Sequence, residues 1–409
     1  MIQKIERTEN SSAASSECQP SRKSVQIRVT SKLEDFADWW PRTDRLGAGL
    51  CYAFQCADIL DIWRDTIGAA RKIQTLFVAV LGEGERPQLL LPLGIERRHH
   101  MRVLTFLDDG VSDYNAPVVF PGAPELDFER IWQDLMRLLP PFDVAIFEKM
   151  PDDICGVLNP LMKLRVTNYS MSGHVTVLSG TWAEFAAHRL PRQRDTRRKR
   201  RRLAKLGSVV FAVAETHADY DKMFASMIRQ KTRRYLETMG VDEFDRLGRR
   251  CYYTEATHRL AGQRTVHLSA LKVDDQIVAT HWGLVVDNRF YSLLPAYEGG
   301  EWSRYSPGRL LIENLIEWSF ANRVEFFDFG VGDEKYKAEF QAHTLSLYRC
   351  ILPVTMAGHI YATVYEAANR TRLAMRNTKV GAMLKRLRIA VRLMRRKYRD
   401  KATTRSTNG

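Results

Sequence analysis

The feature that most constrains the fold of this chain is an internal duplication. Residues 75–95 (TLFVAVLGEGERPQLLLPLGI) and 265–285 (TVHLSALKVDDQIVATHWGLV) align strand to strand and turn to turn. Each segment is two apolar, strand-like runs around a polar turn. The surrounding order also repeats: a strand, two helices, several antiparallel strands, a helix and a last buried strand. This self-similarity predicts one α/β unit that occurs twice.

The repeated order predicts the fold class and the domain boundaries. We expect an α/β (α+β) protein of two tandem repeats, each a mixed, mostly antiparallel sheet flanked by helices. The expected parts are a disordered Ser-rich segment over 1–23, a first domain over 24–172, a second over 173–352 and a basic amphipathic helical tail over 353–409. We expect the two domains to form one compact body with a cleft between them.

The net charge of +14 is concentrated in two segments. Residues 189–205 carry ten basic residues and one acid, and residues 370–401 carry 13 basic residues and one acid, so the rest of the chain is mildly acidic. No apolar run reaches the ~20 residues that span a bilayer, and the N-terminus lacks a signal-peptide core, so we predict a cytoplasmic protein. The six cysteines are scattered without metal-site spacing, which predicts reduced thiols and no metal.

A dense polar cluster follows the last apolar strand of the second repeat. Residues 324–329 form an apolar, aromatic run that contains Asp328 and ends at Gly330 and Gly332. Asp333, Glu334, Tyr336, Lys337 and Phe340 come next. On one helical turn, Tyr336 and Phe340 share a face, so a core pair with a solvated Lys337 is the structural alternative to a functional loop.

Several motifs together resemble one known family. They are SDYNAP (112–117), RRLAKLG (201–207), IVATHWGLV (277–285), SPGRLLIENLIEW (306–318) and FFDFGVGDEKYKAEF (326–340). Over roughly residues 25–350 the chain resembles the CelD-like acetyltransferases associated with bacterial cellulose biosynthesis. That family belongs to the GNAT superfamily and is similar to the Fem-type tandem-GNAT aminoacyl transferases. The resemblance implies acyl transfer from acetyl-CoA or another acyl donor.

The resemblance implies a donor site in the second repeat, at the junction between the strand-like run 290–297 and the helix expected from residue 307. The GNAT phosphate loop is usually Q/R-x-x-G-x-G/A, whereas this chain has Arg304-Tyr-Ser306-Pro-Gly308-Arg309, with one glycine. A helix that begins there still offers free N–H groups and a positive dipole end to a phosphate. We therefore assign Arg304, Ser306, Gly308 and Arg309 to acyl-CoA; a solvated arginine at an ordinary helix start is the alternative.

Acyl transfer also requires oxyanion, acid and base groups. Lys337 is the expected oxyanion donor and Tyr336 the expected thiolate acid, although neighbours about 100° apart on a helix cannot both face one point. Glu298 and His281 are the base candidates, with a surface charge and a core histidine as their alternatives. Asp328, Asp333, Asp113 and Tyr114 are the candidate substrate-binding residues, and Asp328 also suits a structural role because a buried carboxylate needs partners.

Two function classes remain open. The first is an N- or O-acyltransferase, using acetyl-CoA or another acyl-CoA, that modifies a polysaccharide precursor, amino sugar or related acceptor; a tRNA-dependent aminoacyl transferase is its variant. The second is a non-catalytic scaffold that binds anions or membrane. Residues 189–205 suit a nucleotide, a phosphorylated lipid carrier or an acidic polymer.

The tail carries an apolar stripe among basic residues. Val380, Met383, Leu384, Leu387, Val391 and Met394 recur at helical spacing. Residues 371–401 are therefore expected to lie on an anionic inner-membrane surface, or alternatively to pack on the body of the protein. Nucleic acid is a weaker expectation because no recognised nucleic-acid fold accompanies the tail, but tRNA stays open as a partner.

Overall fold

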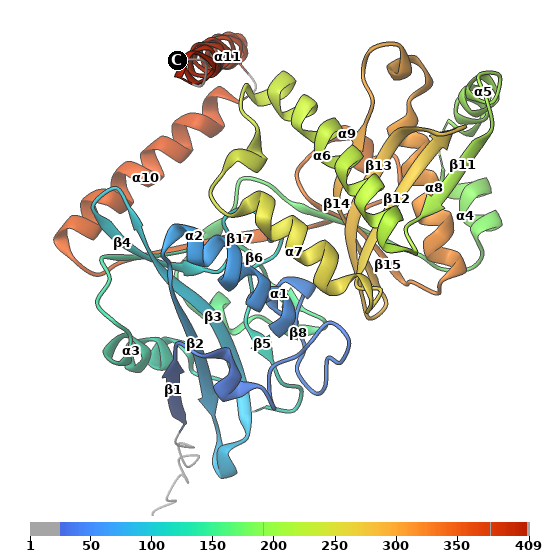
Figure 1. The fold of residues 1–409 in the computed structure, drawn as a ribbon. Coiled ribbons are helices and arrows are strands. Elements are labelled where there is room, and N and C mark those ends of the chain that lie inside the picture. Colours follow the sequence, from blue (N-terminus) through green and yellow to red (C-terminus); the bar gives the residue numbers. More distant parts are fainter. Residues whose placement is uncertain (1–24, 124, 191, 377, 407–409) are drawn as a thin grey trace, which may run out of the picture.

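The computed structural model describes residues 25–406 apart from 124, 191 and 377, with side chains described as far as 396. The predicted disordered segment 1–23 lies outside these residues. Two mixed β-sheets stand on either side of a shared layer of helices, and further helices cover their outer faces (Figure 1). The predicted fold class is therefore confirmed.

The first sheet is built mainly from the first half of the chain. Its strand order is β1 (Gln26–Thr30), β2 (Gln74–Leu81), β3 (Pro87–Arg98), β4 (Met101–Phe106), β6 (Val144–Pro151), β17 (Leu347–Pro353) and β9 (Val166–Asn168), with β5 (Val118–Val119) on β3. Only β4 and β6 pair in parallel. Helices α1 (Ala57–Trp63) and α2 (Ala69–Arg71), joined by a π turn, lie toward the second sheet, and α3 (Phe128–Leu138) packs on the opposite face. A small hairpin, β7 (Asp153–Ile154) with β8 (Val157–Leu158), stands apart.

The second sheet repeats this plan. Its order is β11 (Val209–Val213), β12 (Val266–Val273), β13 (Gln276–Val286), β14 (Arg289–Tyr297), β15 (Phe326–Val331), β10 (Gly173–Val177) and β16 (His343–Leu345), and only β14 and β15 are parallel. Helices α6 (His217–Met239) and α7 (Arg249–Ala261) lie on the inner side; α4 (Trp182–Arg189), α5 (Gln193–Leu203) and α8 (Pro307–Ala321) lie on the outer side. The aligned segments 75–95 and 265–285 thus become β2–β3 and β12–β13.

Strand β17 crosses the predicted domain boundary, and β10 takes the equivalent position in the second sheet. We assigned residues 173–352 to the second domain, but β17 pairs with β6 and β9 of the first sheet. Strand β10, which begins at the predicted start of the second domain, pairs with β15 of the second sheet. Without these partners, β6 after α3 and β15 after α8 would each leave one strand edge unpaired.

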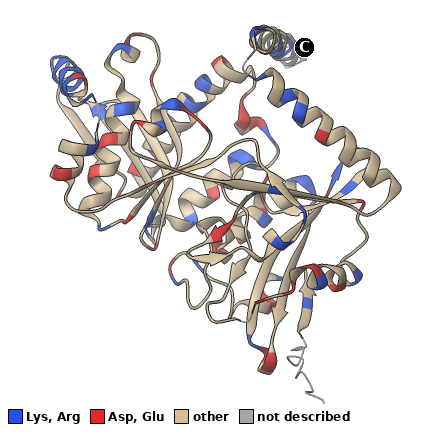
Figure 2. Ribbon diagram, turned by 180° about the vertical axis from the view of Figure 1, so that it is seen from behind, with Lys and Arg blue, Asp and Glu red and all other residues tan. Residues whose placement is uncertain are grey.

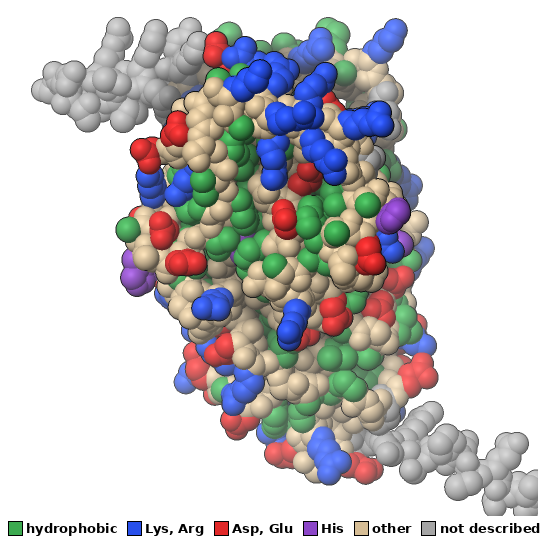
Figure 3. Space-filling view, turned by 90° about the vertical axis from the view of Figure 1, so that its right-hand side faces the viewer, with side chains coloured by type: hydrophobic (Ala, Val, Ile, Leu, Met, Phe, Trp, Pro, Cys, Tyr) green, Lys and Arg blue, Asp and Glu red, His purple; other side chains and the backbone are tan. Residues whose placement is uncertain are grey.

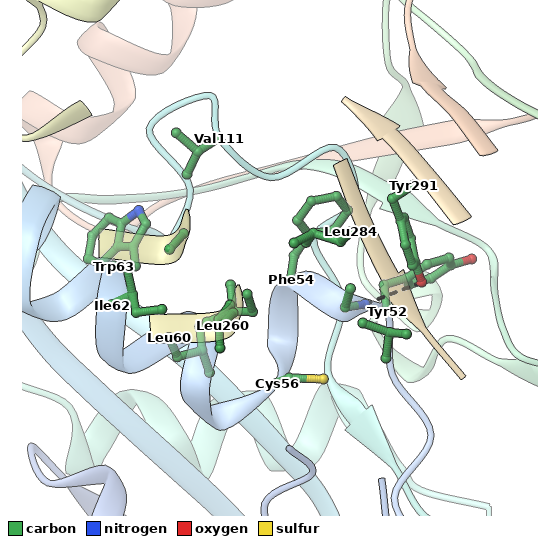
Figure 4. Close-up of a cluster of buried hydrophobic side chains, with 14 of the residues drawn as sticks. Tyr52, Phe54, Cys56, Leu60, Ile62, Trp63, Val111, Leu260, Leu284 and Tyr291 are labelled. Atoms are coloured by element: carbon green, nitrogen blue, oxygen red, sulfur yellow. Dashed lines mark hydrogen bonds between the residues drawn. The ribbon is translucent and has the colours of Figure 1, made fainter. Parts of the chain in front are cut away.

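The largest core joins the two repeats. Tyr52 and Phe54 precede α1 and contact residues of the second repeat, among them Tyr291 on β14, whose hydroxyl accepts the backbone N–H of Ala53 (3.3 Å). Leu260 on α7 and Leu284 on β13 belong to the same cluster (Figure 4). Because the buried apolar surface is continuous across the repeats, they are held together as one body.

The predicted tail is two helices. α10 (Met356–Met375) packs against the first sheet through Tyr361, Ala362 and Tyr365, and α11 (Lys379–Ser406) follows after a short break. Both lie at the edge of the molecule (Figure 1). Among the described residues, no helix has the length and apolar character needed to cross a bilayer.

Candidate active site

The two parallel strands of the second sheet pair only briefly and then separate. β14 and β15 match Arg289 with Phe326, Phe290 with Phe327 and Tyr291 with Asp328. β14 continues to Tyr297 without a strand partner on that side. A gap therefore opens between the carboxyl ends of two parallel strands, and the backbone groups of β14 on that edge need other partners.

Two cations from α6 occupy this free edge of β14. The N–H of Glu298 donates to β13, and because backbone groups alternate along a strand, Pro295 and Tyr297 point to the opposite, open edge. Lys231 Nζ donates to the Pro295 carbonyl (3.2 Å), and Arg233 Nη2 donates to the Tyr297 carbonyl (2.6 Å). A proline suits this edge, since it has no N–H that needs a partner strand.

A carboxylate from the first repeat reaches the same gap. Asp113 follows β4 and touches Gly330 at the end of β15, where a side chain at residue 330 would collide with its carboxylate. The glycine is also required because its φ is +68°. Burial raises the pKa of Asp113 to about 6, against the opposing effect of Lys149. Asp113 is nonetheless only half-buried.

Lys231 is the second group with a pKa near neutrality. Burial is the largest cause and lowers its pKa to about 8, while the charges of Glu334 and Asp113 act in the opposite direction. Like Asp113, it is half-buried rather than fully enclosed. Strongly perturbed, reachable groups of opposite charge at one gap are typical of an active site.

Lys337 lies on the other wall of the gap, in the short helix α9 (Lys335–Ala338). Its ammonium donates to the Gly330 carbonyl (3.1 Å), pairs with Glu334 (3.0 Å) and is 2% exposed. Tyr336 packs edge-on against Phe329, and burial raises its pKa. The roles assigned to these two residues stay predictions.

Asp328 and Tyr114 join the two repeats, and their assignment to substrate binding stays a prediction. Tyr114 Oη and the Gly330 N–H donate to Oδ1 of Asp328 (2.8 and 2.7 Å), and Arg289 donates to Oδ2 through Nε (2.9 Å) and Nη2 (2.8 Å). Both residues are 0% exposed. All of these contacts lie within the protein, so Asp328 and Tyr114 hold the interface in place.

The two predicted bases differ in accessibility. His281 is completely buried, its Nε2 bonds the Ser292 hydroxyl (3.0 Å), and burial lowers its pKa well below the usual value. His281 thus lies in the core, which disfavours a catalytic base because a base must reach the acceptor. Its catalytic role stays a prediction. Glu298 accepts from Arg229 (2.8 Å) and Gln230 (3.2 Å) beside the gap. Its catalytic role stays a prediction.

The expected donor site lies at the start of α8. Ser306 adopts a left-handed conformation as the N-cap residue and its hydroxyl accepts from Lys199 of α5 (3.0 Å). At Gly308 an added Cβ would meet the ring of Tyr297 at 2.9 Å, so the glycine permits close approach of α8 to β14. This brings the positive end of α8 to the gap.

The two arginines assigned to acyl-CoA contact acidic residues of the protein, and their role in donor binding stays a prediction. Arg309 bonds Glu313 (3.1 Å) and Glu339, and it lies over the ring of Phe340. Arg304 is exposed and pairs with Glu301 (3.6 Å). Arg309 is thus engaged in a network within the protein, and Lys199 takes the position next to the helix start.

The basic segment 189–205 forms α5 and covers this end of the second repeat (Figure 2). Thr196 and Leu203 face inward, and Arg200 donates to Asn314 of α8 (2.6 Å). Figure 3, which views the right-hand side of Figure 1, shows basic side chains gathered at the top of that face. The exposed basic residues of α5 are Arg194, Arg197, Arg198, Arg200, Arg201 and Arg202. They add positive potential beside the α8 start.

A cavity of about 590 Å³ lies between the repeats, at the amino-terminal ends of β14 and β15. Its wall includes Tyr52, Asp153, Asp287, Arg289 and His343. Arg289 connects it to the gap through Asp328 and Gly330. The cavity therefore combines aromatic surface with acidic side chains, and the buried Asp328 and Tyr114 lie between it and the gap.

The sequence reasoning did not identify Lys231, Arg233, Arg289 or Lys199 as site residues. Only the proline within a strand-like run, Pro295, signalled an open edge. Asp333 accepts the Ser172 N–H (3.2 Å) and pairs with Arg376 (3.4 Å), and its substrate role stays a prediction. Within the described part of the chain, no group of His, Cys, Asp or Glu is arranged to hold a metal ion.

Comparison with known proteins identifies the second repeat. Residues 191–338 match the family model of the acetyltransferase (GNAT) domain, so this part of the chain is similar to GNAT acyltransferase domains. The match is to the broad domain family, and the narrower CelD-like resemblance stays a prediction. No curated protein matches the chain significantly.

Solved structures align over most of the chain at low similarity. FemX is 10% identical over 71% of this chain and 94% of its own, with a TM-score of 0.48. L-PGS from Bacillus licheniformis is 9% identical over 77% and 97%, with a TM-score of 0.44. A tandem GNAT protein from the clavulanic acid biosynthesis pathway is 10% identical over 81% and 100%, with a TM-score of 0.44. Values this low identify no activity for this chain.

Proposed function

We propose that the protein transfers an acyl group from an acyl-CoA, with acetyl-CoA as the first donor to test, to an amine or hydroxyl of a polysaccharide precursor, amino sugar or related acceptor. The observation that carries this proposal is the gap between β14 and β15, which Asp113 reaches at Gly330 and Lys231 reaches at the Pro295 carbonyl. The GNAT domain match over 191–338 supports the reaction class.

In the proposed mechanism the acyl-CoA supplies the activated carbonyl, and its phosphates lie at the start of α8 near Lys199. Asp113 accepts the proton from the acceptor as its nitrogen or oxygen bonds to the acyl carbon. The bond to sulfur breaks and CoA leaves as a thiolate, which Tyr336 is the candidate to protonate. The ammonium groups of Lys231 and Lys337 favour the negative charge that develops on the carbonyl oxygen. A pKa near 6 makes Asp113 an effective base at neutral pH.

The cavity between the repeats is proposed to bind the part of the acceptor that lies away from the reacting group, because its lining does not include Asp113 or Lys231. Its volume of about 590 Å³ lies within the range of small-ligand pockets. Asp153 and Asp287 suit hydroxyl or ammonium groups, and Tyr52 supplies an aromatic surface for a sugar ring. These features agree with the amino-sugar class and with a role in cellulose or exopolysaccharide synthesis that the CelD-like resemblance suggests.

Thiol release from acetyl-CoA in the presence of an amino-sugar panel tests the function. We expect transfer by the wild type, its loss in Asp113→Asn, and weaker acetyl-CoA binding in Lys199→Gln. Asp275→Asn, in the exposed turn between β12 and β13, is the matched control. Acetyl-CoA at 100 times its Kd should stabilise the fold by about 2.7 kcal/mol. The proposal fails if neither acetyl-CoA nor longer acyl-CoAs stabilise the protein.

A tRNA-dependent aminoacyl transferase is the second candidate. The exposed arginines of α5 favour it, because a row of guanidinium groups suits a polyanionic donor. The same thermal-shift experiment with aminoacyl-tRNA separates the two. Salt-dependent stabilisation by aminoacyl-tRNA, without any effect of acyl-CoA, would replace the first candidate with the second.

A further inference from the structure

The two C-terminal helices expose apolar rows that the body of the protein does not cover. On α11, Val380, Met383, Leu384, Leu387, Val391 and Met394 are between 41% and 69% exposed. On α10, Met356, Ile360 and Val364 are 79%, 66% and 63% exposed. Isolated exposed apolar residues are ordinary, but continuous rows on two successive helices are not.

The apolar row of α11 points away from the protein. The side that meets the body carries Ile389, Leu393 and Arg396, which are the residues of this helix with reduced exposure near its contact with α6. Arg392 Nη1 donates to the Met239 carbonyl (3.1 Å), and Ile389 lies against Gly240. Ile389 follows Leu387 by two positions, which is about 200° around the helix. The row that contains Leu387 therefore lies opposite the contact with the body.

Basic residues border the apolar row on both sides. At 100° per residue, Arg388, Arg392 and Arg395 lie on one side of it, and Lys379 and Arg386 lie on the other. Between residues 379 and 396 the chain carries seven Lys or Arg residues and no Asp or Glu. An outward apolar stripe between two basic borders is the pattern of a helix that lies in a membrane interface.

We propose that α11, assisted by the exposed row of α10, attaches the protein to the surface of an anionic lipid membrane. The contact with α6 fixes the orientation of α11, so its apolar row enters the headgroup region while the body stays outside. A second copy of the chain is a poorer occupant, since it would bring two sets of basic borders together. An anionic surface instead complements them, and each cation adds attraction that salt weakens.

Vesicle flotation with the full-length protein tests this proposal. We expect binding to vesicles that contain phosphatidylglycerol, little binding to phosphatidylcholine alone, and release as salt rises from 0.1 to 1 M, where the Debye length falls from about 10 to about 3 Å. The double variant Leu384→Gln/Leu387→Gln should reduce partitioning into the vesicles about tenfold, because two leucines that the membrane partly buries are lost. The matched control is Leu206→Gln/Leu247→Gln, two exposed leucines outside α10 and α11.

The other occupants give different results. A concentration-dependent dimer that the leucine pair variant abolishes, with no binding to acidic vesicles, would assign the row to a second copy and overturn the proposal. Binding to RNA but not to acidic vesicles would overturn it in favour of nucleic acid. Equal flotation of the wild type and the leucine pair variant would also refute it, because the outward row would then have no part in attachment. Circular dichroism verifies that both double variants are folded.

Discussion

Replacement of Asp113 by asparagine should stabilise the protein at neutral pH while it removes activity. The pKa of Asp113 rises from 3.8 to about 6 on folding, chiefly through burial. At 1.36 kcal/mol per pKa unit, ionised Asp113 costs the folded state about 3 kcal/mol. Asparagine keeps the shape and can still accept the N–H of Val331, but it carries no charge. The full value is an upper bound because the side chain is partly exposed.

The sign of the pH dependence follows from linkage. Below pH 3.8 the carboxyl is protonated in both states and costs nothing. Between 3.8 and about 6 the unfolded chain ionises first, so wild-type stability falls, and above 6 the full cost is present. The stabilisation by Asp113→Asn should therefore grow between pH 4 and pH 7.

Thermal melts of the two proteins across this pH range measure the effect. An unfolding entropy of about 2.1 cal/mol/K per residue, over roughly 380 residues, converts 3 kcal/mol into a Tm increase of about 4 °C. Asp275→Asn should show no such change, since this turn carboxylate is exposed. A Tm difference between Asp113→Asn and wild type that stays constant with pH would refute the assigned burial cost of Asp113.

Three further predictions concern the same site. Lys337→Ala should raise the activation free energy of transfer by about 2.7–4 kcal/mol in a folded protein, as for loss of an oxyanion donor. Tyr336→Phe should have a smaller effect on kcat. Unchanged activity of Lys337→Ala would remove this lysine from the mechanism. The lowered pKa of Lys231 is about 8, so its ammonium loses its proton above that pH and kcat/KM should fall there. Lys231→Arg should move this fall to higher pH. A pH profile that does not move would exclude Lys231 from the mechanism. Arg289→Ala should destabilise the fold by about 3–5 kcal/mol in urea titrations, since it leaves Asp328 buried without its cation; a change below 1 kcal/mol would contradict the interface role.

Some of this organisation follows from the sequence because it depends on local periodicity. The alternation in 75–95 and 265–285 predicts paired strands, and their similarity predicts two repeats, as the structure has them. The run at 324–329 ends at glycines, and Gly330 indeed requires a positive φ. The tail's apolar spacing identifies helices. In each case the information lies within a few consecutive residues.

The site itself depends on contacts between distant segments, and only the tertiary structure could decide it. Asp113 and Lys231 are separated by more than a hundred residues, and they reach the same gap because β14 and β15 diverge after three pairs. Burial there raises the pKa of Asp113 and lowers the pKa of Lys231, so that both move toward neutrality. Burial also lowers the pKa of His281, which lies in the core. The pairing of β10 and β17 satisfies sheet edges that no local pattern describes. Likewise, helical spacing defines the apolar row of α11, but only the contact with α6 determines that the row faces outward.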